Sequence, residues 1–333
     1  MKCLGKILKS SFVVLLFLAS FFASAKNIVI GISLPTQRDV GWVRYKKQFE
    51  LYAKKAGVDV IIQSADQDPS RQSSQVDNLL SEKIDILLIA PQDATAGAAL
   101  VEKAHKSKVR VISFDRLILN SNVDYYVSFD NFKVGELQGQ YLKDKVKSGN
   151  IIVLSGAPTD NNSFLFKAGA MKSLEPAIRS GKLKIVMEQP ILDWQPSRAQ
   201  QMTEDALTKN KNNIQGILAP NDNTAGGVIQ ALAAQQLAGK VIVTGMDGEV
   251  TAAKRILNGT QSMTVFKDQN KLAEVAIQLA VDVVKKGKVN IKVTTDNGKM
   301  KVPSILLAPV VVDKNNLEKV LIQSGYLKRS DVY

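Results

Sequence analysis

The chain has 333 residues, and its 44 Lys and Arg outnumber its 31 Asp and Glu, which gives a formal net charge of +13. It contains one cysteine and one histidine, which argues against a disulfide framework, a zinc centre and a Cys/His nucleophile. The lysines are scattered, without an arginine-rich block or an aromatic RNA-binding motif. The charge therefore predicts a basic, solvated surface and no nucleic-acid partner.

Residues 1–25 have the pattern of a cleaved export signal. Lysines within residues 1–9 precede an apolar stretch at 12–22, and residues 23–25 (Ala-Ser-Ala) fit the small-x-small pattern of signal peptidase. The stretch is shorter than the about 20 apolar residues that span a bilayer. Cys3 precedes the apolar stretch, so it is not placed for lipid attachment. We therefore expect export to a periplasm as a soluble protein.

The rest of the chain repeats a short apolar run, a polar loop and an amphipathic helix. Because the runs are continuously apolar, they are typical of parallel strands that helices cover on both faces. Predicted strands are 28–34, 58–64, 84–90, 109–114, 150–155, 183–188, 214–219 and 241–245. About ten such units exceed one sheet, so the pattern predicts an α/β protein with two doubly wound parallel-sheet lobes.

The alternation breaks at 123–129, where a strand follows 109–114 with no helix between them. We expect the chain to pass from the first lobe to the second at this point. Two late strands, 262–267 and 304–312, could return to either sheet.

Polar and aromatic side chains follow nearly every predicted strand. Since ligands of open parallel sheets bind beyond the carboxyl ends of the strands, these side chains form a candidate site. They are Arg38, Trp42, Asp115, Arg116, Asp130, Asn131, Asp160, Asn161, Asn162, Asp193, Trp194, Asn221, Asp222, Asp247 and Lys267.

This mixture of side chains suits a sugar. Each hydroxyl both donates and accepts, so carboxylates and amides can take its proton while Arg and Lys donate to it. A Trp offers a flat face to the C–H side of the ring. Helix capping is an equal alternative for single residues such as Asn131 or Asp222, but capping does not require Arg116, Trp194 or Lys267.

The motifs of common enzyme classes are absent from the sequence. It has no G-x-G-x-x-G after a strand, no phosphate-binding G-x-x-x-x-G-K-[ST] and no G-x-S-x-G. A glycosidase stays conceivable, because Asp115, Asp222 and Asp247 could converge. Neighbouring Arg and Lys would oppose the raised pKa that an acid catalyst needs. We therefore expect binding without catalysis, and no cofactor or metal.

Several segments form recognisable motifs. They are Ser113–Ile118, Tyr126–Asn131, Val134–Gln138, Gly156–Asn162, Phe166–Gly169 and Asn221–Gly227. Together they resemble the periplasmic sugar-binding proteins of ABC importers, over nearly the whole chain from residue 26, and within that family the D-xylose-binding branch. The loop 34–42 and Asp268 depart from the family pattern, and both bear on which sugar is preferred.

The resemblance implies two Rossmann-like lobes joined by a three-strand hinge, with one monosaccharide, D-xylose first, in the cleft. By analogy the first lobe is 26–129 plus 247–300, and the second is 130–246 plus 301–333. It implies a monomer that serves a membrane ABC permease; a chemoreceptor or sensor kinase is the alternative partner. The implied sugar contacts are Arg38, Asp115, Arg116, Asn162, Trp194, Asn221, Asp247 and Lys267.

Overall fold

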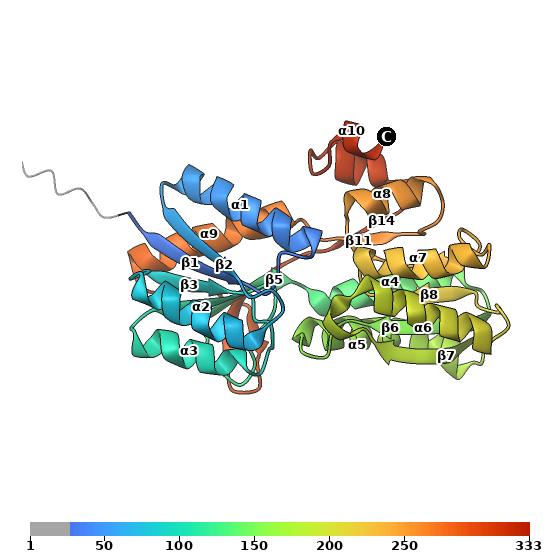
Figure 1. Ribbon diagram of the computed structural model, residues 1–333, viewed down its shortest axis with the longest axis horizontal. Helices are drawn as coiled ribbons and strands as arrows, with labels where there is room; N and C mark the ends of the chain where they lie inside the picture. Colours follow the sequence, from blue (N-terminus) through green and yellow to red (C-terminus); the bar gives the residue numbers. More distant parts are fainter. Residues whose placement is uncertain (1–26) are drawn as a thin grey trace, which may run out of the picture.

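The computed structural model describes residues 27–333 as two α/β lobes that lie side by side (Figure 1). The predicted export signal lies outside these residues. The first lobe consists of β1 (Val29–Leu34), α1 (Val40–Ala56), β2 (Asp59–Ser64), α2 (Pro69–Ser81), β3 (Ile86–Ile89), α3 (Gly97–Lys106), β4 (Arg110–Phe114), β5 (Tyr125–Phe129), α9 (Gln269–Lys286), β12 (Thr294–Asp296) and β13 (Lys301–Leu307).

The second lobe is built from the middle and the end of the chain. Its elements are α4 (Asn131–Lys145), β6 (Gly149–Ser155), α5 (Asn161–Arg179), β7 (Leu183–Pro190), η1 (Leu192–Trp194), α6 (Pro196–Lys209), β8 (Gly216–Leu218), α7 (Asp222–Ala234), β9 (Ile242–Val243), β10 (Met246–Asp247), α8 (Val250–Leu257), β11 (Thr264–Phe266), β14 (Val310–Val312), η2 (Glu318–Ile322) and α10 (Arg329–Val332).

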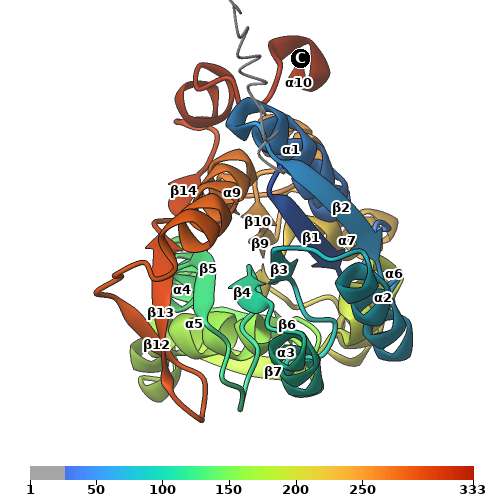
Figure 2. The ribbon, with the colours of Figure 1, turned by 90° about the vertical axis from the view of Figure 1, so that its left-hand side faces the viewer.

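The first lobe is a seven-stranded sheet in the order β12-β13-β5-β4-β3-β1-β2, parallel except for the β12–β13 pair. Helices α1 and α9 pack on one face and α2 and α3 on the other (Figure 2). Both faces of a central strand are therefore buried, and all four residues of β3 (Ile-Leu-Leu-Ile) are inaccessible to solvent. Alternate residues join opposite cores: Ile86 packs with the α1/α9 side and Leu87 with the α2/α3 side.

The second lobe repeats this plan with parallel strands in the order β7-β6-β8-β9, followed by a three-stranded sheet β10-β11-β14. Helices α4 and α5 cover one face of the four strands, and α6 and α7 cover the other. The two-lobe α/β fold class predicted from the apolar runs is thus confirmed. Every predicted strand through 262–267 corresponds to an observed strand.

The predicted lobe limits differ from the observed ones near the end of the chain. Residues 247–266 were expected in the first lobe, but β10, α8 and β11 lie in the second, where β11 pairs with β14. Residues 301–307 were expected in the second lobe, but β13 pairs with β5 in the first sheet. The strand expected at 304–312 is two strands in different lobes, because Pro309 cannot donate a ladder hydrogen bond and the chain crosses there.

The chain passes between the lobes three times, after β5, after β11 and after β13. The first crossing, at Asp130, is the one predicted from the missing helix after 109–114. Within residues 27–333 no helix is both long enough and apolar enough to cross a bilayer.

Candidate functional site

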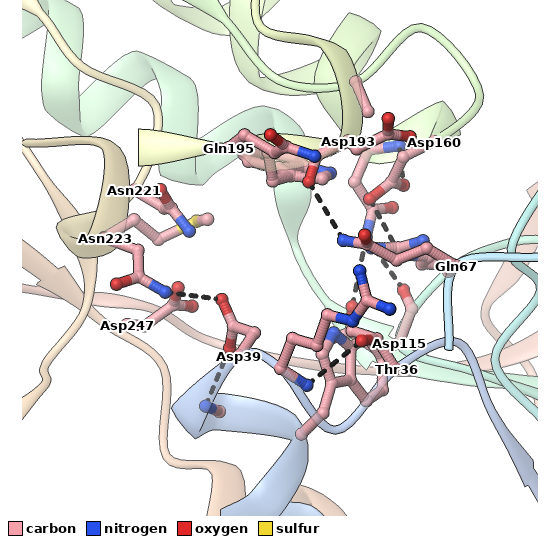
Figure 3. A pocket seen from close by; sticks show the side chains of 18 of the residues that line it. Thr36, Asp39, Gln67, Asp115, Asp160, Asp193, Gln195, Asn221, Asn223 and Asp247 are labelled. Atoms are coloured by element: carbon pink, nitrogen blue, oxygen red, sulfur yellow. Dashed lines mark hydrogen bonds and ion pairs between the residues drawn. The ribbon is translucent and has the colours of Figure 1, made fainter. Parts of the chain in front are cut away.

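A cavity of about 350 Å³ lies between the two lobes, where the carboxyl ends of their strands face each other (Figure 3). Its volume is at the lower end of small-molecule pockets, which span roughly 300–1,000 Å³. All eight residues predicted to contact a sugar lie on its wall: Arg38, Asp115, Arg116, Asn162, Trp194, Asn221, Asp247 and Lys267.

Lys267 lies at the base of the cavity between two carboxylates. Its Nζ is 3.2 Å from Oδ1 of Asp247 and 3.9 Å from Oδ2 of Asp115. The ammonium also lies 5.5 Å from the ring centres of Phe129 and Phe166. Lys267 directly follows β11 of the second lobe, and Asp115 directly follows β4 of the first lobe. This cluster therefore joins the two lobes.

In this cluster, neighbouring opposite charges oppose the effect of burial on the pKa values of Asp247 and Lys267. Burial raises the pKa of Asp247 to about 6, although Lys267 opposes the rise. Burial alone would lower the pKa of Lys267, but Asp247 and Asp115 outweigh it and hold its pKa above the ordinary value. The lysine is therefore a cation that two carboxylates keep charged in a buried site.

Arg116 forms a second buried pair across the lobes. Its Nε is 2.9 Å from Oδ2 of Asp160, an ion pair whose N–H is poorly aligned with the oxygen. The Nη1 donates to the carbonyl of Pro91 at 3.3 Å, and the guanidinium lies 5.4 Å from the ring centre of Trp42. Burial raises the pKa of Asp160, and Arg116 opposes that rise. The remaining guanidinium nitrogens form a planar donor group beside the cavity.

Asn162 connects the lobes from the first turn of α5. Its Nδ2 donates to the carbonyl and to Oδ1 of Asp115, at 3.1 and 3.3 Å, and its Oδ1 accepts from Asn131 at 2.9 Å. The hydroxyls of Tyr126 and Ser128 donate to the same carbonyl of Asp115. Asn162 therefore holds Asp115 in place, in addition to lining the cavity.

Trp194 is the larger of the two aromatic side chains, Phe166 and Trp194, that the second lobe contributes to the cavity wall. It lies in η1 and packs edge-on against Phe166, with 6.4 Å between ring centres. Gly156, at the end of β6, makes room for it, because a Cβ there would be 2.1 Å from Cη2 of Trp194. Its Nε1 is buried without a partner among residues 27–333.

Asn221 and Asp222 follow β8 but have different positions. Asn221 caps α7 through Oδ1, which accepts from the backbone of Thr224, and it lines the cavity. Asp222 is fully buried behind the cavity wall, where it accepts from the backbone N–H groups of Gly248 and Glu249 at 2.9 and 3.0 Å. It thus fixes the turn that follows Asp247. The convergence of Asp222 with Asp115 and Asp247 that the glycosidase alternative would have needed is therefore not observed.

Arg38 occupies the rim. Its side chain is 64% exposed and pairs with Asp66, with Nε 2.7 Å from Oδ1 and Nη2 2.8 Å from Oδ2. This pair raises the pKa of Arg38 and lowers that of Asp66. Arg38 therefore lines the cavity at its solvent-exposed opening, whereas the other two predicted cations, Arg116 and Lys267, are buried.

Five residues of the cavity wall have backbone conformations with positive φ without being glycine. Their φ angles are +69° at Gln67, +58° at Asp115, +54° at Asp193, +56° at Trp194 and +105° at Asp247. Such conformations cost of order 1–3 kcal/mol each and concentrate at ligand-binding sites. Hydrogen bonds to Asp115 and to the turn after Asp247 hold these two residues in their conformations.

The sequence interpretation omitted wall residues that reach across to the opposite lobe. Asn223 donates to Asp39 at 3.0 Å, and Gln67 donates to the carbonyl of Asp193 at 3.3 Å. Gln269 lines the cavity two positions after Lys267. Asp39, Asn223 and Gln269 lie one or two positions beyond residues that were identified, so extending every strand-end search by two positions would have found them. Gln67 has no such neighbour, and no signal in the sequence indicated it.

The lobes are closed over this cavity. Besides the side-chain bonds, the backbone N–H of Ala94 donates to the carbonyl of Thr159 in the other lobe at 2.9 Å. Within residues 27–333 no group of three or more His, Cys, Asp or Glu is arranged to hold a metal ion. The site is thus a chamber with charged donors, carboxylate acceptors and aromatic faces, suited to enclosing a small polyhydroxylated molecule.

A family model described as "Periplasmic binding protein domain" matches residues 30–288. The chain belongs to this periplasmic binding protein family. Among its relatives, the D-xylose-binding periplasmic protein of Haemophilus influenzae is 41% identical over 98% of this chain and 99% of that protein. The multiple sugar-binding periplasmic receptor ChvE of Rhizobium radiobacter is 39% identical over 95% of each chain.

Comparison with solved structures shows the same fold in a protein that binds a carbohydrate. The carbohydrate-transporter solute-binding protein of Chloroflexus aurantiacus, solved with D-glucose, has a TM-score of 0.87 and 34% identity, and the match covers 92% of this chain and 98% of that one. These relatives are binding proteins and not enzymes. The resemblance stated from the sequence motifs is therefore confirmed, as is the expectation of binding without catalysis.

Proposed function

We propose that this chain is exported, captures one monosaccharide in the cavity between its lobes, and delivers it to a membrane ABC permease. The observation that supports this most is the cavity itself, which closes a buried lysine, an arginine, carboxylates and a tryptophan around a space for one small molecule. The relatives named for sugar binding support the same ligand class. D-Xylose is the first candidate, and D-glucose is its main competitor.

The eight wall residues would divide the recognition of the sugar between the lobes. Asp115 and Asp247 would accept protons from hydroxyls, while Arg116 and Lys267 donate to them. Trp194 would cover the C–H face of the ring. A micromolar dissociation constant corresponds to about −8 kcal/mol. A few hydrogen bonds to charged groups, at about 1.5–3 kcal/mol each, together with one stacked ring can supply this after the cost of closure.

Sugar would act by shifting an equilibrium between open and closed lobes. In an open form the cross-lobe contacts of Asp115 with Asn162 and of Arg116 with Asp160 would be broken. A sugar that touches both lobes binds the closed form better and so populates it. The closed pair of lobes then forms the surface that a permease recognises.

Calorimetric titration tests the ligand. The chain from residue 26 onward is titrated with D-xylose, D-glucose, D-ribose, L-arabinose and D-galactose. We expect one site per chain and the tightest binding for D-xylose. Tighter binding of D-glucose would keep the transport function and overturn the pentose preference. An absence of heat with all five sugars, for a folded protein, would overturn monosaccharide binding.

The name of one relative, a periplasmic receptor, supports a second candidate, in which the closed form signals to a chemoreceptor or a sensor kinase. A strain that lacks the gene distinguishes the two. Loss of uptake of the labelled sugar supports delivery to a permease. Retained uptake with loss of the transcriptional or chemotactic response supports the sensor.

A further inference from the structure

The end of the second lobe that lies farthest from the cavity is strongly basic. It consists of the loops and helix ends that precede β6, β7, β8 and β9, at the right-hand end in Figure 1. We call it the basic end, and its charged residues are Lys145, Lys147, Arg179, Lys182, Lys184, Lys209, Lys211 and Lys240, all exposed.

These residues belong to one continuous surface, because the four strands are neighbours in one sheet. Hydrogen bonds join the loops directly: Gly149 to the carbonyl of Lys182 at 2.8 Å, Asn150 to the carbonyl of Asn213 at 2.8 Å, and Asn212 to Gln235 at 3.1 Å. Three strand spacings of about 4.8 Å make the row of loops roughly 15 Å wide.

Acidic residues at the basic end are confined to the helices, where Asp144 precedes Lys145 in the last turn of α4 and Glu175 precedes Arg179 by one turn. The stretches 145–150, 179–187, 207–216 and 235–246 contain no Asp or Glu. Of the eight basic residues only Arg179 forms an ion pair within residues 27–333, with Glu175 one turn earlier. The corresponding loops of the first lobe mix both signs, with Asp59, Glu82, Asp85 and Asp124 among their lysines.

Helix capping does not account for this concentration of charge. A cation in the last turn of a helix interacts favourably with the helix dipole, which suffices for Lys145, Arg179 and Lys209. Lys147 donates from Nζ to the carbonyl of Asp144 in the last turn of α4 at 3.0 Å, so the helix end also accounts for it. Lys182, Lys184, Lys211 and Lys240 lie beyond the helix ends, where the effect of the dipole has faded. Four lysines without an ion-pair partner within residues 27–333 therefore lie on one surface and repel one another, which favours an anion from outside the protein.

We infer that the basic end is a docking surface for a bilayer that carries anionic lipid headgroups. Seven of its eight cations are lysines, which attract negative charge as mobile point charges and lack the planar fork that grips a single phosphate. The four acid-free stretches contain no aromatic residue on which a nucleic-acid base could stack. Such a surface suits diffuse attraction to many headgroups at once.

This attraction would hold the protein reversibly beside a membrane. It decays within a Debye length, about 8 Å at physiological ionic strength, so binding is weak and sensitive to salt. The cavity lies at the other end of the lobe and stays unobstructed. The physiological role of membrane docking rests on the proposed export and delivery, but the surface itself does not depend on them.

The experiment measures partition of the chain from residue 26 onward onto vesicles. This segment holds every described helix and strand and lacks the apolar residues 12–22, which would insert by themselves. The probes are vesicles of phosphatidylglycerol with phosphatidylcholine, and vesicles of phosphatidylcholine alone. We expect binding to the anionic vesicles only, and its loss at about 1 M salt, where the Debye length is about 3 Å.

Two variants with the same change in net charge locate the surface. The test variant is K147Q/K182Q/K184Q/K211Q/K240Q, and the control is K54Q/K83Q/K106Q/K108Q/K288Q in the first lobe. We expect the test variant to lose about tenfold or more in vesicle affinity and the control about twofold or less. Equal losses would show that net charge alone acts and would overturn the basic end as a surface.

Further arms separate other ligands from a lipid surface. Release of the protein from vesicles by millimolar glycerol phosphate would show a site for free phosphate and overturn the inference. Tighter binding of single-stranded DNA than of vesicles, lost in the same test variant, would also overturn it. Sugar titration of both variants checks folding and is independent of the outcome, since no changed lysine lies on the cavity wall.

Discussion

Gly156 controls the position of Trp194, so a methyl group at this residue tests the role of the indole. The added Cβ of Gly156→Ala would lie 2.1 Å from Cη2 and 2.2 Å from Cζ2 of Trp194. The indole must therefore shift from its position on the cavity wall. We expect sugar affinity to fall about tenfold, which corresponds to about 1.4 kcal/mol, as measured by calorimetric titration.

A double-mutant cycle separates this effect from a general loss of structure. If Gly156→Ala acts through the indole, adding it to Trp194→Ala should cost little further affinity. Full additivity of the two losses would contradict the proposed role of Gly156. The tryptophan fluorescence of the single variant reports the displacement independently.

Lys267 gives a prediction for pH. In Lys267→Met, Asp247 and Asp115 lose the cation between them, so the pKa of Asp247 should rise above its present value of about 6. A carboxyl whose pKa is higher in the folded than in the unfolded chain makes folding less favourable as pH rises through that interval. We expect the free energy of unfolding of the variant, relative to the wild type, to fall between pH 6 and pH 8 in urea titrations.

The control for this charge effect is Lys271→Met, four residues later. Lys271 is exposed and pairs with Glu274 at 2.7 Å, so its loss removes one surface pair. Such a pair is worth about 0–1 kcal/mol and should leave the pH dependence unchanged. Parallel pH profiles for Lys267→Met and the wild type would contradict the coupling of Lys267 to Asp247.

The sequence identified the candidate site well because strand ends are local features. An apolar run followed by Asp115 and Arg116 places both at the sheet edge where ligands bind. What it could not show is pairing across the lobes, such as Asn223 with Asp39, since this depends on how two sheets face each other. Nor could it show that Arg38 is held at the rim by Asp66, 28 residues away.

Among the elements, the α4–α5 pair is packed closely through glycines. A Cβ on Gly135 would lie 1.9 Å from the carbonyl oxygen of Phe166, and one on Gly169 would lie 2.0 Å from that of Phe132. We expect Gly135→Ala to lower the free energy of unfolding by about 2–4 kcal/mol, because the helices must separate. Urea denaturation measures this, and sugar affinity should fall as well, since Phe166 lines the cavity.

Gly226→Ala is the matched control for close helix packing. Gly226 also lies inside a helix, α7, but an added Cβ there would meet no backbone atom within 4 Å and only the guanidinium of Arg255, with Nη1 at 3.2 Å. Alanine is favoured over glycine in helices by about 1 kcal/mol, so this variant should be unchanged or slightly stabilised. Equal destabilisation at both positions would contradict the packing explanation.

The elements were easier to predict than their assignment to lobes. Short apolar runs between polar loops predict buried parallel strands, and these were found. The strand expected at 304–312 combined β13 and β14, because Val, Ile and Leu continue on both sides of Pro309. Apolar character is the same in either sheet, so composition does not reveal the lobe to which a strand returns.

For the whole molecule, the closed lobes predict a change of shape on binding. Several contacts across the cavity are made by single side chains, such as Gln67 to the carbonyl of Asp193 and Asn223 to Asp39, which an opening of the lobes would break. We expect small-angle X-ray scattering to show a smaller radius of gyration when saturating sugar is added, because the ligand adds contacts to both lobes. Asp115→Ala should remove the change at the same sugar concentration.

Identical scattering with and without a bound sugar would contradict closure by the ligand. The cavity would then exist before binding, and sugar would have to enter through local motion of the rim. Calorimetry on the same sample distinguishes this result from a sugar that does not bind.

The order of strands in the first sheet also has a consequence for synthesis. β5 ends at Phe129 and its neighbour β13 begins at Lys301, so the 171 residues 130–300 separate two strands that pair side by side. At about 5–20 residues per second, the ribosome delivers β13 roughly 10–30 s after β5. The first sheet therefore lacks this neighbour of β5 until the ribosome has passed residue 307, so β5 has one unpaired edge throughout the synthesis of the second lobe up to β11.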